Sequence, residues 1–350
     1  MSTTKQLLVD NGFFSCRIRR RGENMSVKKS VLQALEENRE TTISGEQLAK
    51  KLNISRSSVW KAINSLKQEG YSIGATTNKG YRLETGSDVI SFEGIRQWLG
   101  PQNQEIIIEA YKTIGSTNQV AKKMALDGAI QGTVIISEEQ TQGRGRLGRR
   151  FFSPANSGIY MSLILRPNVY ADKAVLVTTA ASVGVCRAIK KVANKDLQIK
   201  WVNDIYLDDK KICGILTEAV TNFETGLVEC VIIGIGLNFR LPENNFPADL
   251  IEIAGSLFEE KPDLLTRNRL AGEIINAVLE LCEDLENRDF LEEYKKRSMV
   301  LGHKIKVHQQ NNWSFARAVD ISEDGGLIVE NEAGELETIN SGEITIRKME

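Results

Sequence analysis

Apolar residues recur at helical spacing near the start of the chain and predict three helices. The first covers residues 27–38 and places its valines and leucines on one face. Ser44, with Gln47 three residues later, has the sequence of a capping box and predicts the start of a second, short helix. Ser55 predicts the N-cap of a third helix over residues 56–69. We expect the three helices to share one small core.

Beyond Gly70 the apolar pattern changes to alternation. Residues 71–74 and 80–83 alternate around a turn at 76–79, which predicts a β-hairpin. Two helices joined by a tight turn and followed by such a hairpin are typical of a winged helix-turn-helix domain, here residues 25–84, whose second helix enters the DNA major groove. The positions expected to face DNA are Arg56, Ser57, Ser58, Lys61, Asn64, Lys67 and Lys79.

Local charge supports DNA as the partner of this segment. Residues 25–83 carry ten Lys or Arg against five Glu and no Asp, whereas the whole chain has a formal net charge of −1. Contacts to phosphates need such a local positive excess. A helical module that binds another protein is the alternative, and the capped helix, the turn and the hairpin together argue against it.

Residues 85–88 predict a linker, after which strands and helices interleave. The predicted helices are 93–99, 118–127, 173–191 and 264–285, and the predicted strands are 106–110, 133–137, 159–165, 199–207, 210–218 and 228–238. The strands follow one another too closely for a regular βαβ alternation. We therefore expect a domain over residues 91–300 in which helices pack on a mixed sheet.

After residue 300 the pattern becomes one of short strands separated by glycine-containing turns. These strands are predicted at 304–307, 315–321, 327–329, 336–339 and 344–346. Their spacing predicts a small antiparallel β-barrel over residues 301–350. The expected fold class is α+β multidomain, with a winged helix, a mixed-sheet domain and a small barrel in that order.

Composition excludes several classes of protein. The five cysteines form no C-x-x-C pair and the two histidines give no zinc-ligand spacing, as is typical of a reduced, cytoplasmic protein. No apolar run approaches the ~18 residues of a membrane helix, so no membrane partner is expected.

Residues 1–24 hold a basic cluster, and Met25 resembles a natural start, so a leader that is disordered or not native is expected there.

Residues 141–150 contain four arginines and three glycines, which predict a loop that closes over an anion. Gly143, Gly145 and Gly148 also match the G-x-G-x-x-G dinucleotide pattern. That pattern needs a helix directly after the glycines, whereas Phe151 begins a turn-rich connection to the next strand. We therefore reject a dinucleotide site, and a solvated basic loop without a ligand is the remaining alternative.

Three further stretches place polar or small groups where a ligand could be held. The Ser-Thr-Asn sequence at 116–118 is expected to cap a helix, and it can equally present hydroxyl and amide groups to a small polar ligand. Asp204 and Lys211 flank a predicted turn and should meet at one end of the sheet, with a turn or capping role for Asp204 as the alternative. The glycines within 234–238 permit close backbone approach.

Taken in order, these motifs resemble the bifunctional biotin–protein ligases and biotin-operon repressors of bacteria. The most specific are G-R-G-R-L-G-R at 143–149 and K-W-V-N-D at 200–204, followed by Lys211 and Gly214. The resemblance covers Met25 to the C-terminus. It implies a biotin/lipoate ligase-like catalytic domain in the centre and an SH3-like barrel at the end.

The resemblance implies a two-step reaction. Biotin and Mg-ATP give biotinoyl-5′-AMP and pyrophosphate, and the biotinoyl group then passes to a lysine of a biotin carboxyl carrier protein domain. By matching motif, the biotin-binding residues are Ser116, Thr117, Asn118, Gln140, Arg144, Gly145, Arg146 and Lys211. The ATP- or adenylate-binding residues are Arg146, Arg149, Asn203 and Asn238, and Mg²⁺ is expected to arrive with ATP rather than in a protein cage.

The chemistry of both steps fits these roles. The first step joins two anions, a carboxylate and the α-phosphate, so Arg146, Arg149 and Lys211 would neutralise charge that grows in the transition state. In the second step the acceptor lysine attacks as the neutral amine, and Asp204 would orient it or take its proton. The predicted catalytic residues are therefore Arg146, Lys211 and Asp204.

The sequence departs from the family pattern at two positions and leaves one region open. Val202 stands where the family usually has proline, and Phe151 stands where an aromatic residue, often tryptophan, follows the loop. Neither departure removes a charged or donor group. A second loop that covers the adenylate should fall within residues 240–256, but the sequence does not locate its site residues.

The resemblance further implies a homodimer in the adenylate-bound state that reads a palindromic operator, with biotinoyl-AMP as corepressor. Two alternatives stay open. A repressor that senses biotin without ligase activity would need fewer charged residues than this chain carries. A lipoate–protein ligase-like enzyme is not expected to carry a winged helix.

Overall fold

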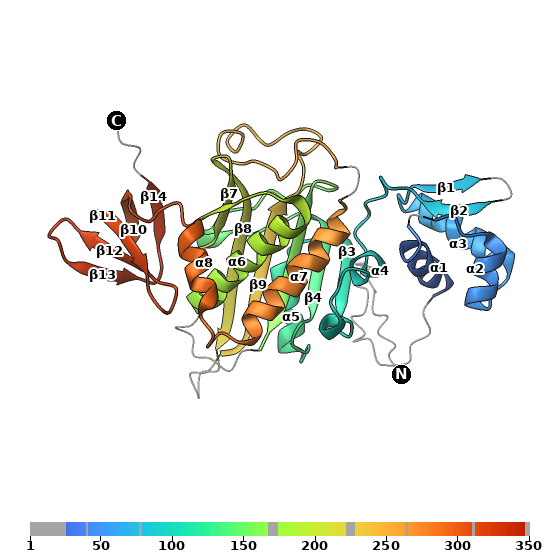
Figure 1. Cartoon of the computed structure of the whole chain (residues 1–350), viewed down its shortest axis with the longest axis horizontal. Coiled ribbons are helices and arrows are strands. Elements are labelled where there is room, and N and C mark those ends of the chain that lie inside the picture. Colours follow the sequence, from blue (N-terminus) through green and yellow to red (C-terminus); the bar gives the residue numbers. More distant parts are fainter. Residues whose placement is uncertain are drawn as a thin grey trace, which may run out of the picture.

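The computed structural model describes residues 26–39, 41–76, 79–166, 174–221, 228–262, 265–309 and 312–346. It is elongated, and a helical N-terminal domain, a central layer of strands and helices and a small C-terminal sheet follow one another along it (Figure 1). The predicted leader at 1–24 lies outside the described residues. None of the described helices is both long and apolar enough to span a membrane.

The N-terminal domain has the three helices and the hairpin that the apolar pattern predicts. Its elements are α1 Val27–Glu36, α2 Gly45–Leu52, α3 Arg56–Gln68, β1 Ile73–Thr76 and β2 Gly80–Leu83. The capping box is confirmed, because Ser44 Oγ accepts from the Gln47 N–H at 3.1 Å and the Ser44 N–H donates to the Gln47 side chain at 2.8 Å. Ser55 caps α3 by accepting from the Ser58 N–H. Apolar side chains of the helices and the hairpin form one core.

The central domain is built on a seven-stranded sheet in the order β3-β4-β5-β9-β8-β7-β6. Its strands are β3 Ile108–Ile114, β4 Val134–Gln140, β5 Gly158–Leu165, β6 Gln198–Lys200, β7 Asp204–Leu207, β8 Lys210–Thr221 and β9 Val228–Asn238. β3 and β4 are parallel, and the other neighbouring pairs are antiparallel. The sheet is therefore mixed, as predicted.

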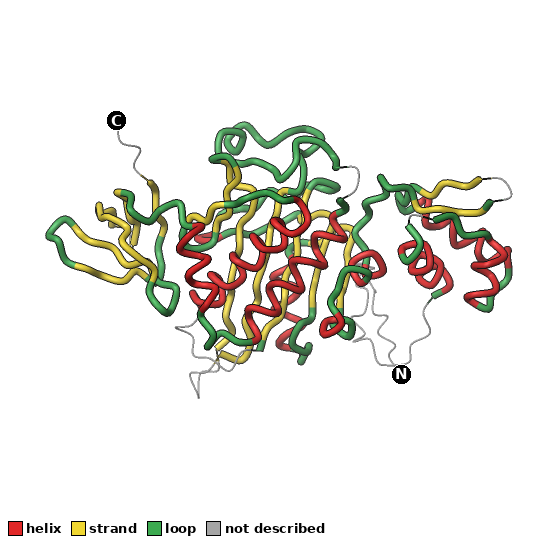
Figure 2. Tube along the Cα trace, viewed as in Figure 1, coloured by secondary structure: helices red, strands yellow, loops and turns green. Residues whose placement is uncertain are grey.

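Helices cover both faces of this sheet. α6 Ala174–Ala193 and α7 Arg267–Glu283 pack together on one face, as Figure 2 shows, and α5 Thr117–Leu126 packs on the other. Each face of the sheet has its own hydrophobic core, because successive side chains along a strand point to opposite faces. In β4, Val134 and Ile136 belong to the core under α6 and α7, whereas Ile135 between them belongs to the core under α5. The remaining helices are α4 Phe92–Arg96 and α8 Asp289–Arg297, of which α8 was not predicted.

The predicted single strand at 199–207 is in fact two antiparallel strands, β6 and β7, joined by a tight turn. Contacts from distant parts of the chain hold this turn. The Trp201 indole N–H donates to the Gly325 carbonyl at 3.0 Å, and the Asn203 side chain donates to the Ile215 carbonyl at 2.8 Å. Because both partners lie outside the segment, its apolar pattern alone could not reveal the turn.

The C-terminal strands form an antiparallel sheet in the order β13-β12-β11-β10-β14. They are β10 Lys304–Gln309, β11 Asn312–Ile321, β12 Leu327–Asn331, β13 Leu336–Ile339 and β14 Glu343–Ile346. The five predicted strands are confirmed. Among the described residues no hydrogen-bonded ladder joins β13 to β14, so the sheet is open where a closed barrel was expected.

In the predicted linker, residues 85–88, Thr85 and Gly86 are exposed, whereas Ser87 and Asp88 pack against neighbouring residues. Ser87 is only 1% exposed. The Asp88 carboxylate accepts from Arg267 Nε at 2.9 Å across 179 residues of chain. Arg267, at the start of α7, is itself 1% exposed and also donates to Glu138 in β4 at 2.6 Å. The connection between the domains is therefore anchored by buried ion pairs.

Candidate active site

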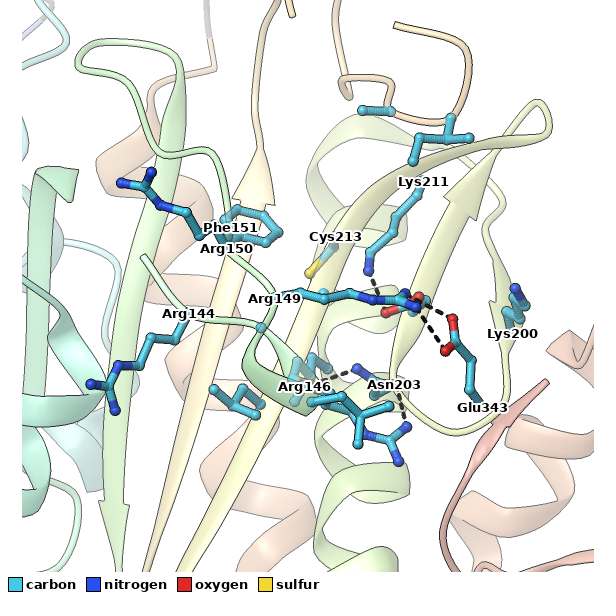
Figure 3. A pocket seen from close by; sticks show the side chains of 18 of the residues that line it. Arg144, Arg146, Arg149, Arg150, Phe151, Lys200, Asn203, Lys211, Cys213 and Glu343 are labelled. Atoms are coloured by element: carbon cyan, nitrogen blue, oxygen red, sulfur yellow. Dashed lines mark hydrogen bonds and ion pairs between the residues drawn. The ribbon is translucent and has the colours of Figure 1, made fainter. Parts of the chain in front are cut away.

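A cavity of about 220 Å³ opens where the Arg-Gly loop, residues 141–150, meets the ends of β7 and β8 (Figure 3). Side chains from residues 200–216, 246–254 and 342–344 supply the other walls. The last of these segments belongs to the C-terminal sheet. Asn238, at the end of β9, also lines the cavity, so five separate parts of the chain build it.

Backbone hydrogen bonds fold the Arg-Gly loop onto itself. The Gly145 N–H donates to the Arg149 carbonyl at 2.8 Å, and the Phe151 N–H donates to the Gly143 carbonyl at 3.0 Å. Leu147 has a left-handed φ of 54° and a side chain that is 71% exposed. Between this loop and β5 the described residues contain no α-helix, in agreement with the rejection of a dinucleotide site.

Two arginines of the loop reach into the cavity. Arg146 donates to the Asn203 side chain and to the Gly342 carbonyl, each at 3.0 Å. Arg149 lies 2.7 Å from the Glu343 carboxylate. Burial lowers the pKa of Arg146, although neighbouring carboxylates oppose the shift. The loop is thereby tied to both the central and the C-terminal domain.

Asp204 and Lys211 meet as predicted. β7 and β8 are joined by a turn at Asp208 and Asp209, which both have positive φ. Lys211 Nζ lies 2.6 Å from Asp204 Oδ1, and both side chains are partly exposed to the cavity. A cation and a carboxylate are thus poised together at the wall where a ligand would enter.

Cations outnumber carboxylates around this cavity. The inward charges are the cations of Arg146, Arg149, Lys200 and Lys211 and the carboxylates of Asp204 and Glu343. Burial lowers the pKa of Lys200. Arg144 and Arg150 also border the cavity but extend away from Lys211 (Figure 3). Four positive against two negative charges leave an excess that favours an anionic ligand.

A second, smaller pocket adjoins the first and shares Arg144, Phe151 and Gly214 with it. Its polar lining consists of Ser116, Thr117, Asn118 and Gln140, which are the residues predicted to hold the ligand's polar head. The first three are at most 4% exposed. A compact polar group could be bound there with its remainder directed toward the cationic cavity.

Hydrogen bonds hold the polar side chains of this pocket in place. Gln140 Oε1 accepts from the Thr117 hydroxyl at 3.1 Å, and Asn118 Oδ1 accepts from the Ser162 hydroxyl at 2.6 Å. Ser116 occupies the N-cap position of α5, yet its side chain makes no capping hydrogen bond. The expected capping role is therefore wrong for Ser116, which lines the pocket instead.

Two glycines of β9 make room for these side chains. A Cβ at Gly234 would overlap the side-chain amide of Asn118, and a Cβ at Gly236 would lie 2.6 Å from the ring of Phe151. The Phe151 ring therefore packs on the backbone of β9 at position 236, where any side chain larger than that of glycine would overlap it. This is the close approach that the glycines at 234–238 predict.

The resemblance implies that this pocket holds the biotin head, and on that expectation Gly234→Ala should weaken biotin binding about tenfold or more, because the new methyl group displaces Asn118 and leaves a buried polar group without its partner. Isothermal titration of biotin into the purified protein measures the effect. Gly86→Ala, whose Cβ would lie 3.8 Å from its nearest neighbour, is the matched control and should bind biotin normally. An unchanged affinity in the Gly234 variant would contradict this role of the pocket.

Three family models match the chain in the order of its domains. They are the HTH domain at residues 27–82, the Biotin/lipoate A/B protein ligase family at 110–238 and the Biotin protein ligase C terminal domain at 300–347. The chain is also 32% identical over 329 residues to the bifunctional ligase/repressor BirA of Bacillus subtilis (strain 168), covering 92% of this chain and 99% of that protein. The chain belongs to the BirA family.

Other relatives agree with this membership. The BirA protein of Escherichia coli (strain K12) is 28% identical over 88% of this chain and 94% of its own length. Among solved structures, the biotin protein ligase from Aquifex aeolicus in complex with biotin and ATP superposes with a TM-score of 0.58 at 23% identity, over 69% of this chain and 99% of that one. That likeness shows a shared fold.

The prediction from sequence missed two contributors to the site of this BirA-family chain, Lys200 and Glu343, and named no residues in a third, the region 240–256. Lys200 lines the cavity, although the K-W-V-N-D motif already contained it. The region 240–256, left open by the sequence, runs beside Lys211, whose N–H donates to the Ile253 carbonyl at 2.9 Å. Glu343 comes from the C-terminal sheet, and no local pattern signals that it reaches the loop.

Proposed function

We propose that this protein is an ATP-dependent biotin–protein ligase that also represses transcription of a biotin operon. It forms biotinoyl-5′-AMP and pyrophosphate from biotin and ATP and transfers the biotinoyl group to a lysine of a biotin carboxyl carrier protein domain. The observation that carries the proposal is the cationic cavity joined, at Phe151 and Gly214, to a buried polar pocket. Membership of the BirA family supports both activities.

In the first step the biotin head occupies the pocket at Ser116–Asn118 and Gln140, and its carboxylate points into the cationic cavity. Arg146, Arg149 and Lys211 face that cavity and stabilise the negative charge that builds up as the carboxylate attacks the α-phosphate. Asn203 and Asn238 also line the cavity, on the side assigned to the nucleotide.

Mg²⁺ is proposed to enter with the triphosphate and to neutralise part of its charge. The inward carboxylates Asp204 and Glu343 already face Lys211 and Arg149. Among the described residues no cluster of three or more His, Cys, Asp or Glu is arranged to hold a metal. The cations that line the cavity fit a role in binding the phosphates.

In the second step Asp204 acts on the acceptor lysine. Its carboxylate lies 2.6 Å from Lys211 Nζ. When Lys211 turns to the adenylate, that carboxylate is released to orient the incoming amine or take its proton. The Phe151 ring and residues 246–254 line the site, and in this proposal they shield a reactive acyl-adenylate from water.

Repression is assigned to the N-terminal domain. Arg56, Ser57, Lys61 and Lys67 are exposed along α3, and Ser58 and Asn64 are partly exposed beside them. Lys79 is exposed at the hairpin. These donors suit contacts to phosphates and base edges in a major groove.

A homodimer in the adenylate-bound state is proposed for operator binding, and the edge of β8 supports it. β7 pairs with β8 only as far as Gly214, while β9 pairs with β8 along its other edge up to Thr221. Among the described residues, no strand pairs with residues 216–221 of β8 on the edge that faces β7. An unpaired strand edge is a ready site for a second copy to add its own strand.

Pyrophosphate exchange into ATP tests the first step. We expect exchange that depends on biotin, and we place the reaction in the cytoplasm, where ATP and the carrier protein are present. Biotin binding without exchange would favour the sensor-repressor alternative. Exchange that depends on lipoate in place of biotin would favour the lipoate ligase-like alternative.

A further inference from the structure

Trp60, in α3, is the most exposed of the four tryptophans, with 58% of its surface accessible. Each of the others has a partner. Trp201 is buried and donates to a carbonyl, Trp98 lies under the Arg269 guanidinium at 4.7 Å, and Trp313 stacks on an imidazole at 4.4 Å. A large indole left in solvent on a short helix calls for a physical reason, because burying it would be favourable.

The position of Trp60 on the helix supplies that reason. Residues three or four apart share a helical face, so Trp60 lies beside Arg56, Ser57 and Asn64. Its inner neighbour by the same spacing is Ile63, which is buried in the core of α3. The indole therefore lies at the side of the exposed surface through which α3 is proposed to meet DNA.

The chemistry of the major groove offers one apolar target for this side chain. Phosphates attract Arg56, one turn before the indole, and Lys61, the next residue along α3, which carry the charge that the indole lacks. Base edges present hydrogen-bonding atoms and, on thymine only, a methyl group. An uncharged and largely apolar ring thus matches a thymine methyl better than a phosphate.

We propose that Trp60 is a specificity-determining residue whose indole packs against thymine methyl groups in the major groove. The inference rests on the proposed DNA binding and goes beyond it by assigning one contact and one base. It predicts a recognition sequence with thymine where α3 enters the groove. The contact contributes to sequence selectivity and little to the salt dependence of binding.

The test uses a duplex that the full-length wild type, with biotin and ATP present, selects from a random pool. Each thymine is then replaced by uracil, which removes only the methyl group. We expect one or two replacements to weaken wild-type binding about fourfold each, as the loss of one buried methyl implies, and to leave binding by Trp60→Ala unchanged. Alanine is a good helix former, so the exposed substitution should leave ligase activity intact.

Lys61→Ala is the matched control on the same helix. It should bind all duplexes more weakly, lower the slope of log affinity against log salt by about one, and keep the uracil effect. Trp60→Ala should keep the wild-type slope. Uracil effects that are absent in the wild type, or equal in the wild type and Trp60→Ala, would overturn the proposal. Failure of the wild type to select any duplex would instead overturn DNA binding itself, and this inference with it.

Discussion

Lys211→Ala and Arg146→Ala are each expected to reduce biotin-dependent pyrophosphate exchange by about a hundredfold to a thousandfold. Both side chains face the cavity where the carboxylate and the α-phosphate would meet, and removal of one charge-stabilising donor from a water-excluded site has effects of about this size. Arg146 also holds Asn203 at 3.0 Å, so its loss releases the loop as well. The assay follows labelled pyrophosphate into ATP at saturating biotin.

Arg150→Ala is the matched control for these variants. It removes an arginine from the same loop, but one whose guanidinium extends away from Lys211 (Figure 3). Its exchange rate should stay within a few-fold of the wild type. If Lys211→Ala retained nearly full exchange, the assignment of charge neutralisation to this cavity would be wrong.

Arg267→Met is expected to lower the free energy of unfolding by about 3–5 kcal/mol, which is the effect of breaking a buried ion network from one side. Arg267 is 1% exposed and donates to the carboxylates of Asp88 and Glu138 at 2.9 Å and 2.6 Å. Its removal leaves two buried carboxylates without their cation. Urea unfolding of the intact chain measures the change.

Arg82→Met provides the comparison for the buried network. Arg82 pairs with Glu84 at 3.1 Å, but both side chains are more than 40% exposed. An exposed pair of this kind contributes about 0–1 kcal/mol. Equal destabilisation by the two substitutions would show that the network between the domains contributes no more than a surface ion pair.

Local chemistry made much of the fold predictable. The capping box at Ser44, the strand Val228–Asn238 and the turn at Asp208 and Asp209 depend on residues close in sequence, and the structure has all three. The same holds for the meeting of Asp204 with Lys211, since a two-residue turn leaves few alternatives.

Contacts between distant residues account for what the sequence did not reveal. The turn within 199–207 depends on the Gly325 carbonyl, more than a hundred residues away. The packing of Asp88 at the end of the predicted linker depends on Arg267, which looks like an ordinary polar start of a helix. Glu343 contributes its charge to the site because the C-terminal sheet contacts the Arg-Gly loop of the central domain there. No periodicity along the chain encodes such pairings.

Transfer of labelled biotin to a purified biotin carboxyl carrier protein domain, with Mg²⁺ and ATP, tests both steps of the proposed ligase reaction. We predict covalent labelling of one lysine by the wild type, abolished when that lysine is replaced and reduced at least a hundredfold by Lys211→Ala. Tight biotin binding by the wild type without any labelling of the carrier domain would contradict the account and leave a biotin-sensing repressor.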